Sequence, residues 1–267
     1  MLEFSSFPCS SVPFRGEKDI MPKPPRFFIS PNQVSGQSIT VSGEDVSHIV
    51  KVLRMKTGDE LLLCDGKGTE YSVNIAQVTK SDITTDVKAR SKREIREPLI
   101  ILGQGLPKSD KMDWIVQKAT ELGVATIVPL VTERTIVKIK DEEKRVSRWQ
   151  KICREAAMQC NRPDIPQVGR IVSFSDFLRP LNPEPRTLLL LPWEEGTVPI
   201  KEILRANPGI KNVVVLIGPE GGFSAHEAEM AKERGFSLVS LGQNILRTET
   251  AAMAVLSMIL YETSDNS

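Results

Sequence analysis

Two clusters of glycine and polar residues follow apolar runs in the last third of the chain. Residues 218–222 (GPEGG) come directly after NVVVLI, and glycines there permit a positive φ and a close approach of the backbone to a ligand. Residues 241–251 (LGQNILRTETA) place Arg247 directly before an apolar helix pattern. A strand-to-helix turn needs glycine without any ligand, but a cation beside a helix N-terminus is slightly unfavourable. Arg247 therefore indicates an anionic or carbonyl-bearing ligand.

The segments around these clusters alternate between apolar strand patterns and helix patterns. We expect strands at residues 99–106, 125–130, 187–191, 212–218 and 237–242, and helices at residues 109–123, 142–160, 224–234 and 248–261. Such alternation predicts a mostly parallel sheet covered by helices on both faces. Ligands of these folds bind at the carboxyl ends of the strands, where both clusters lie. The sequence therefore predicts an α/β domain with a ligand site at one edge of its sheet.

The first part of the chain has a different pattern of predicted elements. Short strand patterns at residues 26–30, 38–42, 60–66, 69–78 and 83–89 are separated by turn residues, and one helix pattern at residues 44–55 interrupts them. They predict a small β-barrel over residues 22–92, followed by the α/β domain over residues 93–267. Residues 1–21 suit neither a signal nor a transit peptide, and we expect a disordered extension there.

Composition narrows the class of protein. The charges are nearly balanced, with 35 basic and 34 acidic residues, so any contact with nucleic acid must come from local basic patches. Two histidines and four cysteines without a CxxC spacing predict neither a metal site nor a disulfide framework, and they fit a reducing cytoplasm. No apolar run approaches the roughly 18 residues that a membrane helix requires.

The chain resembles one known family in several blocks. In chain order these blocks are VLRMKTGDE, GLPKSDKMDWIVQKATELGV, PLVTERT, REAAMQCNRPDIP, GPEGGFSAHEAE and LGQNILRTETAAMAVL. They are similar to the ribosomal RNA small-subunit methyltransferase E family of SPOUT, or trefoil-knot, methyltransferases. The likeness covers roughly residues 22–262, and the ordered set is far more specific than GPEGG alone.

The resemblance implies a PUA-like barrel that helps to hold RNA and a knotted α/β domain with a parallel sheet that binds S-adenosylmethionine and forms a homodimer. The activity it implies is methylation of N3 of one uridine in 16S ribosomal RNA, within the assembled small subunit. Three loops would enclose the methyl donor. The cofactor-binding residues that it implies are Leu191, Pro192, Ile217, Gly218, Pro219, Glu220, Gly221, Gly222, Leu241, Gly242, Ile245, Leu246, Arg247, Thr248, Thr250 and Ala251.

Candidate catalytic residues follow from the chemistry of a uridine imide. Loss of the N3 proton leaves negative charge on two flanking carbonyls, which a guanidinium could stabilise. Arg162 is our first candidate for that role and Arg247 the second. Glu249 and Glu220 are candidate bases, although both could be structural and the proton could leave through water.

Contacts to RNA phosphates should come from basic side chains, because aromatic residues make up only 5% of the chain. The candidates are Arg26, Arg54, Lys56, Lys92, Arg93, Lys108 and Arg134. Two other functions stay open: a SPOUT enzyme that acts on transfer RNA or on a ribose hydroxyl, and an RNA-binding assembly factor without catalysis.

Overall fold

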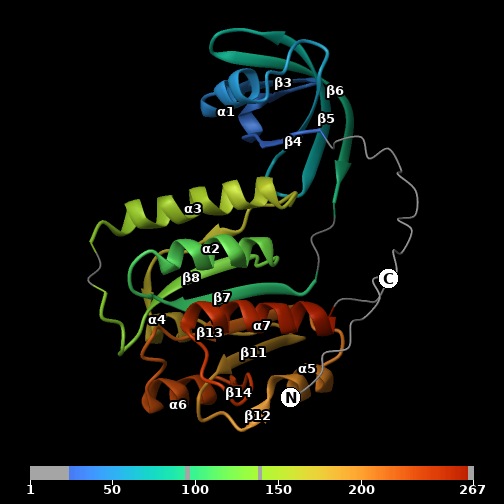
Figure 1. The fold of residues 1–267 in the computed structure, drawn as a ribbon. Coiled ribbons are helices and arrows are strands. Elements are labelled where there is room, and N and C mark those ends of the chain that lie inside the picture. The colour runs from blue at the N-terminus through green and yellow to red at the C-terminus, as the bar shows by residue number, and fades with distance from the viewer. Residues whose placement is uncertain (1–23, 94–96, 138–139, 264–267) are drawn as a thin grey trace, which may run out of the picture.

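The computed structural model describes residues 24–93, 97–137 and 140–263. The expected disordered extension at residues 1–21 lies outside these ranges. The chain forms a small β domain followed by a larger α/β domain, and helix α3 (Glu142–Gln159) lies beside the β domain (Figure 1). The last strand of the β domain ends at Lys92, and the first strand of the α/β domain begins at Leu99.

The β domain is a bent six-stranded sheet with the order β1-β4-β5-β6-β3-β2, in which only β1 and β4 are parallel. Alternate side chains of its strands point into one core, which includes Ile39 and Val41 of β3. The expected helix over residues 44–55 is a short α-helix, α1, that continues as a π-helical turn, η2. The elements are β1 (Arg26–Phe28), η1 (Pro31–Gln33), β2 (Val34–Ser35), β3 (Ser38–Ser42), α1 (Glu44–Ser47), η2 (His48–Val52), β4 (Glu60–Cys64), β5 (Thr69–Val78) and β6 (Asp82–Lys92).

The α/β domain contains an eight-stranded sheet in which every strand pair is parallel. Its order is β10-β8-β7-β13-β11-β14-β12, with β9 paired to β8. The central strands are apolar on both faces, as expected for strands that helices cover on both sides. The strands are β7 (Leu99–Gly105), β8 (Thr126–Val131), β9 (Gln167–Val168), β10 (Val172–Ser173), β11 (Thr187–Pro192), β12 (Val198–Pro199), β13 (Asn212–Ile217) and β14 (Ser237–Ser240).

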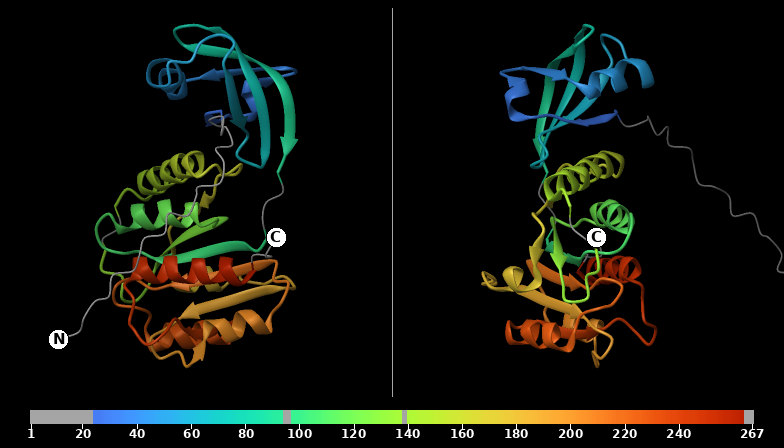
Figure 2. Two further views of the ribbon diagram at one scale, coloured as in Figure 1. Left: turned by 45° about the vertical axis from the view of Figure 1, so that its right-hand side comes forward. Right: turned by 90° about the vertical axis from the view of Figure 1, so that its left-hand side faces the viewer.

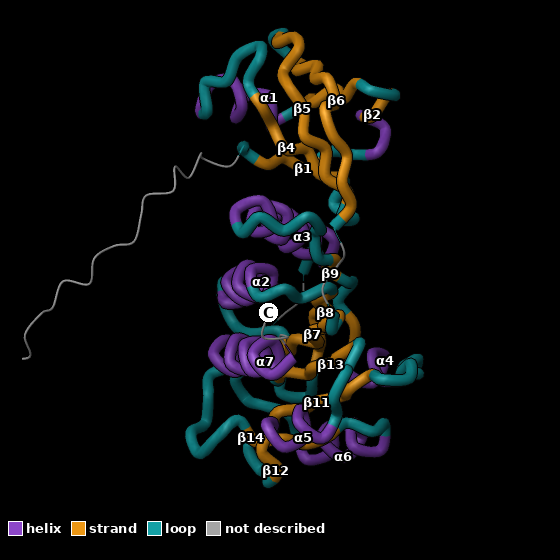
Figure 3. The backbone as a smooth tube through the Cα atoms, turned by 90° about the vertical axis from the view of Figure 1, so that its right-hand side faces the viewer, coloured by secondary structure: helices purple, strands orange, loops and turns teal. Residues whose placement is uncertain are grey.

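Helices cover the two faces of this sheet. On one face α2 (Lys111–Glu121), α3, α5 (Ile200–Ala206) and α7 (Thr248–Thr263) enclose one core. On the other face α4 (Phe174–Leu178) and α6 (Ala225–Glu233) enclose a second core. Figure 3 shows α3, α2 and α7 stacked on one side of the strands, with α4 and α6 on the other. The carboxyl ends of the central strands are thereby left free for a site.

Five short elements of the α/β domain were not expected from the sequence: β9, β10, β12, α4 and α5. The three strands have two residues each, too few to show an alternating pattern. The two helices have five and seven residues, fewer than two full turns, so they carry only a weak periodic signal.

The two domains share a packed junction, where the β domain stands next to α3 (Figure 2). Phe28 and Cys64 from the β domain form a buried cluster with Ala157 of α3. Arg154 of α3 donates a hydrogen bond to the carbonyl oxygen of Phe28 at 2.7 Å and pairs with Asp45 at 2.9 Å. Apolar and polar contacts together therefore fix the β domain against α3.

Candidate functional site

A cavity of about 540 Å³ lies at the carboxyl ends of β11, β13 and β14. Three loops line it: residues 192–194 after β11, residues 217–223 after β13, and residues 240–248 between β14 and α7. Lys111, the first residue of α2, and Ala251 of α7 complete the lining. The two sequence clusters, at residues 218–222 and 241–251, therefore meet around one pocket.

Most of the expected cofactor-binding residues line this cavity. They are Pro192, Ile217, Gly218, Pro219, Glu220, Gly221, Gly222, Leu241, Gly242, Ile245, Leu246, Arg247, Thr248 and Ala251. Two expected residues lie elsewhere: the side chain of Leu191 is buried in the core on the α4 and α6 face, and Thr250 is exposed on α7. A strand residue next to a binding loop can point into the core, because successive side chains of a strand alternate between faces.

Sequence reasoning missed other residues that line the cavity: Lys111, Trp193, Glu194, Phe223, Ser240, Gln243 and Asn244. A signal existed for Lys111, because a lysine at the start of a helix is as unfavourable as the arginine beside α7. Trp193 and Glu194 directly follow β11, at the same edge of the sheet as the two clusters.

The GPEGG turn folds tightly on itself. Gly222 has a φ of 67°, and its N–H donates to the carbonyl oxygen of Pro219 at 2.9 Å. Gly218 and Gly221 do not use the positive φ that glycine permits. Gly218 is needed for a different reason: a Cβ there would lie 2.9 to 3.1 Å from backbone atoms of Gly222 and Phe223. The turn therefore closes on its own backbone at residue 218, where no side chain fits.

The carboxyl end of strand β7 packs against the GPEGG turn. A Cβ on Gly105 would lie 2.6 Å from Pro219, so this glycine lets the turn pack on the strand end. The side chain of Gln104 is fully buried, and its Nε2 donates to Thr248 Oγ1 at 2.9 Å. Thr248 Oγ1 in turn donates to the carbonyl oxygen of Gly218 at 2.6 Å. This chain of hydrogen bonds joins β7, the turn and the start of α7.

The loop after β8 forms hydrogen bonds with the GPEGG turn and with the start of α6. Arg134 Nη1 donates to the carbonyl oxygen of Gly221 at 2.7 Å. The buried carboxylate of Glu227 accepts hydrogen bonds from the backbone N–H groups of Glu133 at 2.9 Å and Ser224 at 3.0 Å. Arg134, an expected RNA contact, is exposed beside the cavity.

A charged cluster lies at the wall of the cavity. Lys111 Nζ is 3.1 Å from Glu220 Oε1 and 3.3 Å from Glu249 Oε2. Partial burial would raise the pKa of Glu220, but hydrogen bonds from its own N–H, from Lys111 and from the N–H of Lys108 lower the pKa overall. The hydrogen bond to Glu220 is the main cause of a raised pKa at Lys111. The lysine is therefore held as a cation, and Glu220 is a weak base.

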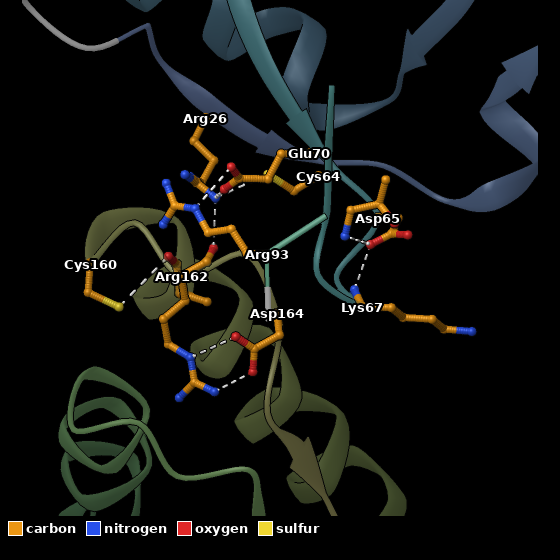
Figure 4. Close-up of polar contacts among 11 residues, drawn as sticks. Arg26, Cys64, Asp65, Lys67, Glu70, Arg93, Cys160, Arg162 and Asp164 are labelled. Atoms are coloured by element: carbon orange, nitrogen blue, oxygen red, sulfur yellow. Dashed lines mark hydrogen bonds and ion pairs between the residues drawn. The ribbon is translucent and has the colours of Figure 1, made fainter. Parts of the chain in front are cut away.

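The two sequence candidates for the catalytic guanidinium lie in different places. Arg247 lines the cavity and is exposed. Arg162 lies at the junction between the two domains (Figure 4).

The guanidinium of Arg162 is occupied by groups of its own chain. Its Nη1 donates to the carbonyl oxygens of Thr120 and Val124, each at 2.8 Å, and its Nε and Nη2 pair with Asp164. The side chain is only 12% exposed, and the two carbonyls lie at the C-terminal end of α2. The expected catalytic role of Arg162 does not fit this geometry; the residue closes a helix end instead.

Arg26 also lies at this junction (Figure 4). Its side chain is 4% exposed, and its Nη1 lies 2.6 Å from Glu70 Oε1 and 3.1 Å from the carbonyl oxygen of Arg162. The expectation that Arg26 contacts RNA phosphates is therefore wrong, because the guanidinium is buried and already paired. Arg93 forms a second ion pair with Glu70, and its side chain is 52% exposed. The remaining candidates for RNA contact, Arg54, Lys56, Lys92 and Lys108, are exposed.

The described residues contain neither a membrane-spanning helix nor a cluster of metal ligands. No helix among them combines the length and the apolar composition needed to cross a membrane. Their His, Cys, Asp and Glu side chains form no group of three that could hold a metal ion.

Comparison with known proteins adds to this geometry. Residues 95–260 match the family model described as RNA methyltransferase domain, and residues 41–88 match the RNA methyltransferase PUA domain. The chain is 33% identical over 234 residues to the ribosomal RNA small subunit methyltransferase E of Bacillus subtilis (strain 168), across 85% of this chain and 91% of that protein. It is 30% identical over 235 residues to the protein of the same name from Synechocystis sp. (strain ATCC 27184 / PCC 6803 / Kazusa), across 88% of this chain and 76% of that protein.

A solved structure agrees with the sequence matches. A crystal structure of a ribosomal RNA small subunit methyltransferase E from Neisseria gonorrhoeae, bound to S-adenosyl methionine, superposes with a TM-score of 0.80. The identity is 32%, and the match covers 89% of this chain and 97% of that chain. The expected fold class, a PUA-like domain followed by a SPOUT-type domain with a parallel sheet, is confirmed.

Proposed function

We propose a reaction for this protein on the basis of its family, because the chain belongs to the ribosomal RNA small subunit methyltransferase E family. The protein transfers a methyl group from S-adenosylmethionine to N3 of one uridine in 16S ribosomal RNA. The substrate is the RNA within the assembled small subunit, in the cytoplasm. The observation that carries the proposal is the pocket enclosed by the GPEGG turn and the loop before α7.

The residues of the pocket fit this methyl donor. A cavity of about 540 Å³ is large enough for a nucleoside-sized ligand, and much of its wall is backbone and small or apolar side chains. Gly218 and Gly222 let the turn close tightly on itself at the wall of the pocket. The loops after β11, β13 and β14 would hold the donor, which supplies a methyl carbon whose bond to sulfur breaks as N3 forms its new bond and loses its proton.

The chain's own contribution is to orient the acceptor and to stabilise its charge. Arg247 lines the pocket and offers a guanidinium to a carbonyl oxygen of the acceptor. Glu220 is a poor candidate base, because its lowered pKa favours the ionised form and weakens its basicity. Release of the N3 proton to water fits these groups better.

RNA would lie across the pocket and the β domain. Arg134 and Lys108 are exposed next to the GPEGG turn. Arg134 donates a hydrogen bond to the carbonyl oxygen of Gly221, and the backbone N–H of Lys108 donates to the carboxylate of Glu220. Arg54, Lys56 and Lys92 are exposed on the β domain. Contacts from these side chains to phosphates would set the register of the RNA without reading its sequence.

The active form is a homodimer. Apolar side chains stay exposed in the single chain at α2, in the pocket loop and on α7, namely Trp114 at 44%, Ile245 at 84% and Tyr261 at 84%. Helix α7 is apolar around most of its circumference, which is typical of a helix that is covered on all sides. A monomer at micromolar concentration in sedimentation that still methylates RNA would contradict this assignment.

The deciding experiment identifies the methylated nucleoside. Small-subunit particles that lack the modification, naked 16S RNA and transfer RNA are each incubated with the protein and labelled donor, and the nucleosides are then separated. We expect 3-methyluridine from the particles. A ribose-methylated nucleoside, or label in transfer RNA, would replace the proposed acceptor. Binding of RNA without binding of the donor in calorimetry would indicate an assembly factor instead.

A further inference from the structure

Lys111 is a positive charge at an unusual place. It is the first residue of α2, it lines the pocket, and none of the sequence patterns drew attention to it. The N-terminus of a helix carries a partial positive charge, so a lysine there is disfavoured. Two carboxylates from other elements offset this: Glu220 in the turn after β13 and Glu249 in the first turn of α7.

A purely structural explanation of this cluster is weak. The side chain of Lys111 is 31% exposed, and those of Glu220 and Glu249 are 28% and 20% exposed. Ion pairs with this much access to solvent contribute little to stability. Glu220 also accepts a hydrogen bond from the N–H of Lys108, so the turn has an anchor that does not need the lysine.

The chemistry of the acceptor calls for more than one cation. A uridine imide has a carbonyl on each side of N3, and the negative charge that develops during transfer spreads over both. Arg247 offers a guanidinium from the loop before α7, and Lys111 offers an ammonium from α2. The two carboxylates keep that ammonium charged, because they raise its pKa.

We propose that Lys111 is a catalytic residue that stabilises the developing negative charge of the acceptor, and that Glu220 and Glu249 are positioning residues that hold its ammonium at the pocket wall. This role rests on the proposed function. It adds no reactant and moves no proton, since the ammonium only interacts with charge on the acceptor.

The test compares Lys111→Gln and Lys111→Arg with Lys118→Gln. Lys118 is a matched control: it lies on the same helix, pairs with Glu121 at 2.8 Å and has a side chain that is 35% exposed, but it does not line the pocket. Single-turnover methylation of small-subunit particles gives the rate, calorimetry gives the affinity for S-adenosylmethionine, and thermal unfolding without donor gives the stability.

We expect Lys111→Gln to slow single turnover by about 100-fold, the scale of one lost charge-stabilising donor, with donor affinity and melting temperature nearly unchanged. Its rate should rise with pH over a range in which the wild-type rate is flat, since a less stabilised acceptor anion needs a higher pH to form. Lys111→Arg should recover part of the rate because it keeps the charge, and Lys118→Gln should match the wild type.

Other outcomes would overturn the role of Lys111. A wild-type rate in Lys111→Gln would remove the residue from catalysis and leave the proposed function intact. If weaker donor binding explains the whole loss of rate in Lys111→Gln and the pH profile is unchanged, Lys111 has only a structural role in the pocket. Label at an atom other than N3 would also overturn this role, because the argument for a second cation depends on the two carbonyls that flank N3. A wild-type protein that methylates none of the RNAs would overturn both proposals.

Discussion

Gln104 and Thr248 lie 144 positions apart in the chain, yet Gln104 Nε2 donates a hydrogen bond to Thr248 Oγ1 at 2.9 Å. Thr248 in turn fixes the position of the GPEGG turn, because its hydroxyl donates a hydrogen bond to the carbonyl oxygen of Gly218. The pocket loops are therefore held by a buried side chain of β7 that does not line the pocket itself.

The first prediction concerns this hydrogen-bond chain. Thr248→Val removes the donor to Gly218 and leaves Gln104 Nε2 without one of its two acceptors, so we expect the affinity for S-adenosylmethionine to fall by about tenfold, or ~1.4 kcal/mol. Thr248→Ser keeps the hydroxyl and should bind the donor nearly as well as the wild type. Titration calorimetry measures both; equal affinities for the valine variant and the wild type would contradict the prediction.

The second prediction separates the glycines of the turn. Gly218→Ala places a Cβ against backbone atoms that cannot move aside, so we expect at least about tenfold weaker donor binding, from overpacking strain of ~1–3 kcal/mol. In Gly221→Ala the new Cβ would lie 3.1 Å from the Cβ of Arg134, a milder contact than that at Gly218, because the exposed loop after β8 has to yield by only a few tenths of an ångström. That variant should bind nearly normally. A reversed order of the two affinities in calorimetry would be inconsistent with this geometry.

The third prediction concerns the buried pair of Arg26 and Glu70. Arg26→Ala leaves Glu70 buried with only the half-exposed Arg93 as partner, so we expect a loss of about 3–5 kcal/mol in the free energy of unfolding. Arg93→Ala removes a pair that solvent screens and should cost about 0–1 kcal/mol. Urea unfolding of both variants gives the two values. Similar losses for the two would mean that the buried pair is not the stronger contact.

The fourth prediction concerns pH. Burial raises the pKa of the Cys64 thiol from 9.0 to about 11, and the neighbouring Arg26 lowers it only in part. A pKa that is raised in the folded state contributes stability below the unfolded value, and this stability is lost as the pH rises through the folded value. The free energy of unfolding should therefore fall between about pH 9 and about pH 11.

Cys64→Ala tests the cause of that fall. The variant has no thiol to titrate, so its stability should decline less over the same pH range, although its stability at neutral pH is lower because of the lost packing. Urea unfolding at several pH values gives the difference between the two proteins. Parallel curves for both would show that other groups cause the decline.

The sequence by itself determined the order of the main elements and the two clusters that line the pocket. Strand and helix periodicity is a local property, so β5, β7, β13, α3 and α7 could be predicted within a few residues. GPEGG and LRTETA marked the pocket for a similar reason: each is a short segment at the carboxyl edge of a parallel sheet.

Only the tertiary structure decided what the charged residues do. Arg26 and Arg162 look like surface cations in the sequence, but Glu70, 44 positions from Arg26, and the carbonyl of Thr120, 42 positions from Arg162, bind their guanidinium groups. Lys111 looks like an ordinary helix residue until Glu220 and Glu249 meet it at the pocket wall. The free energy of a charge depends on its burial and its partners, and both are set by chain segments that a local pattern does not contain.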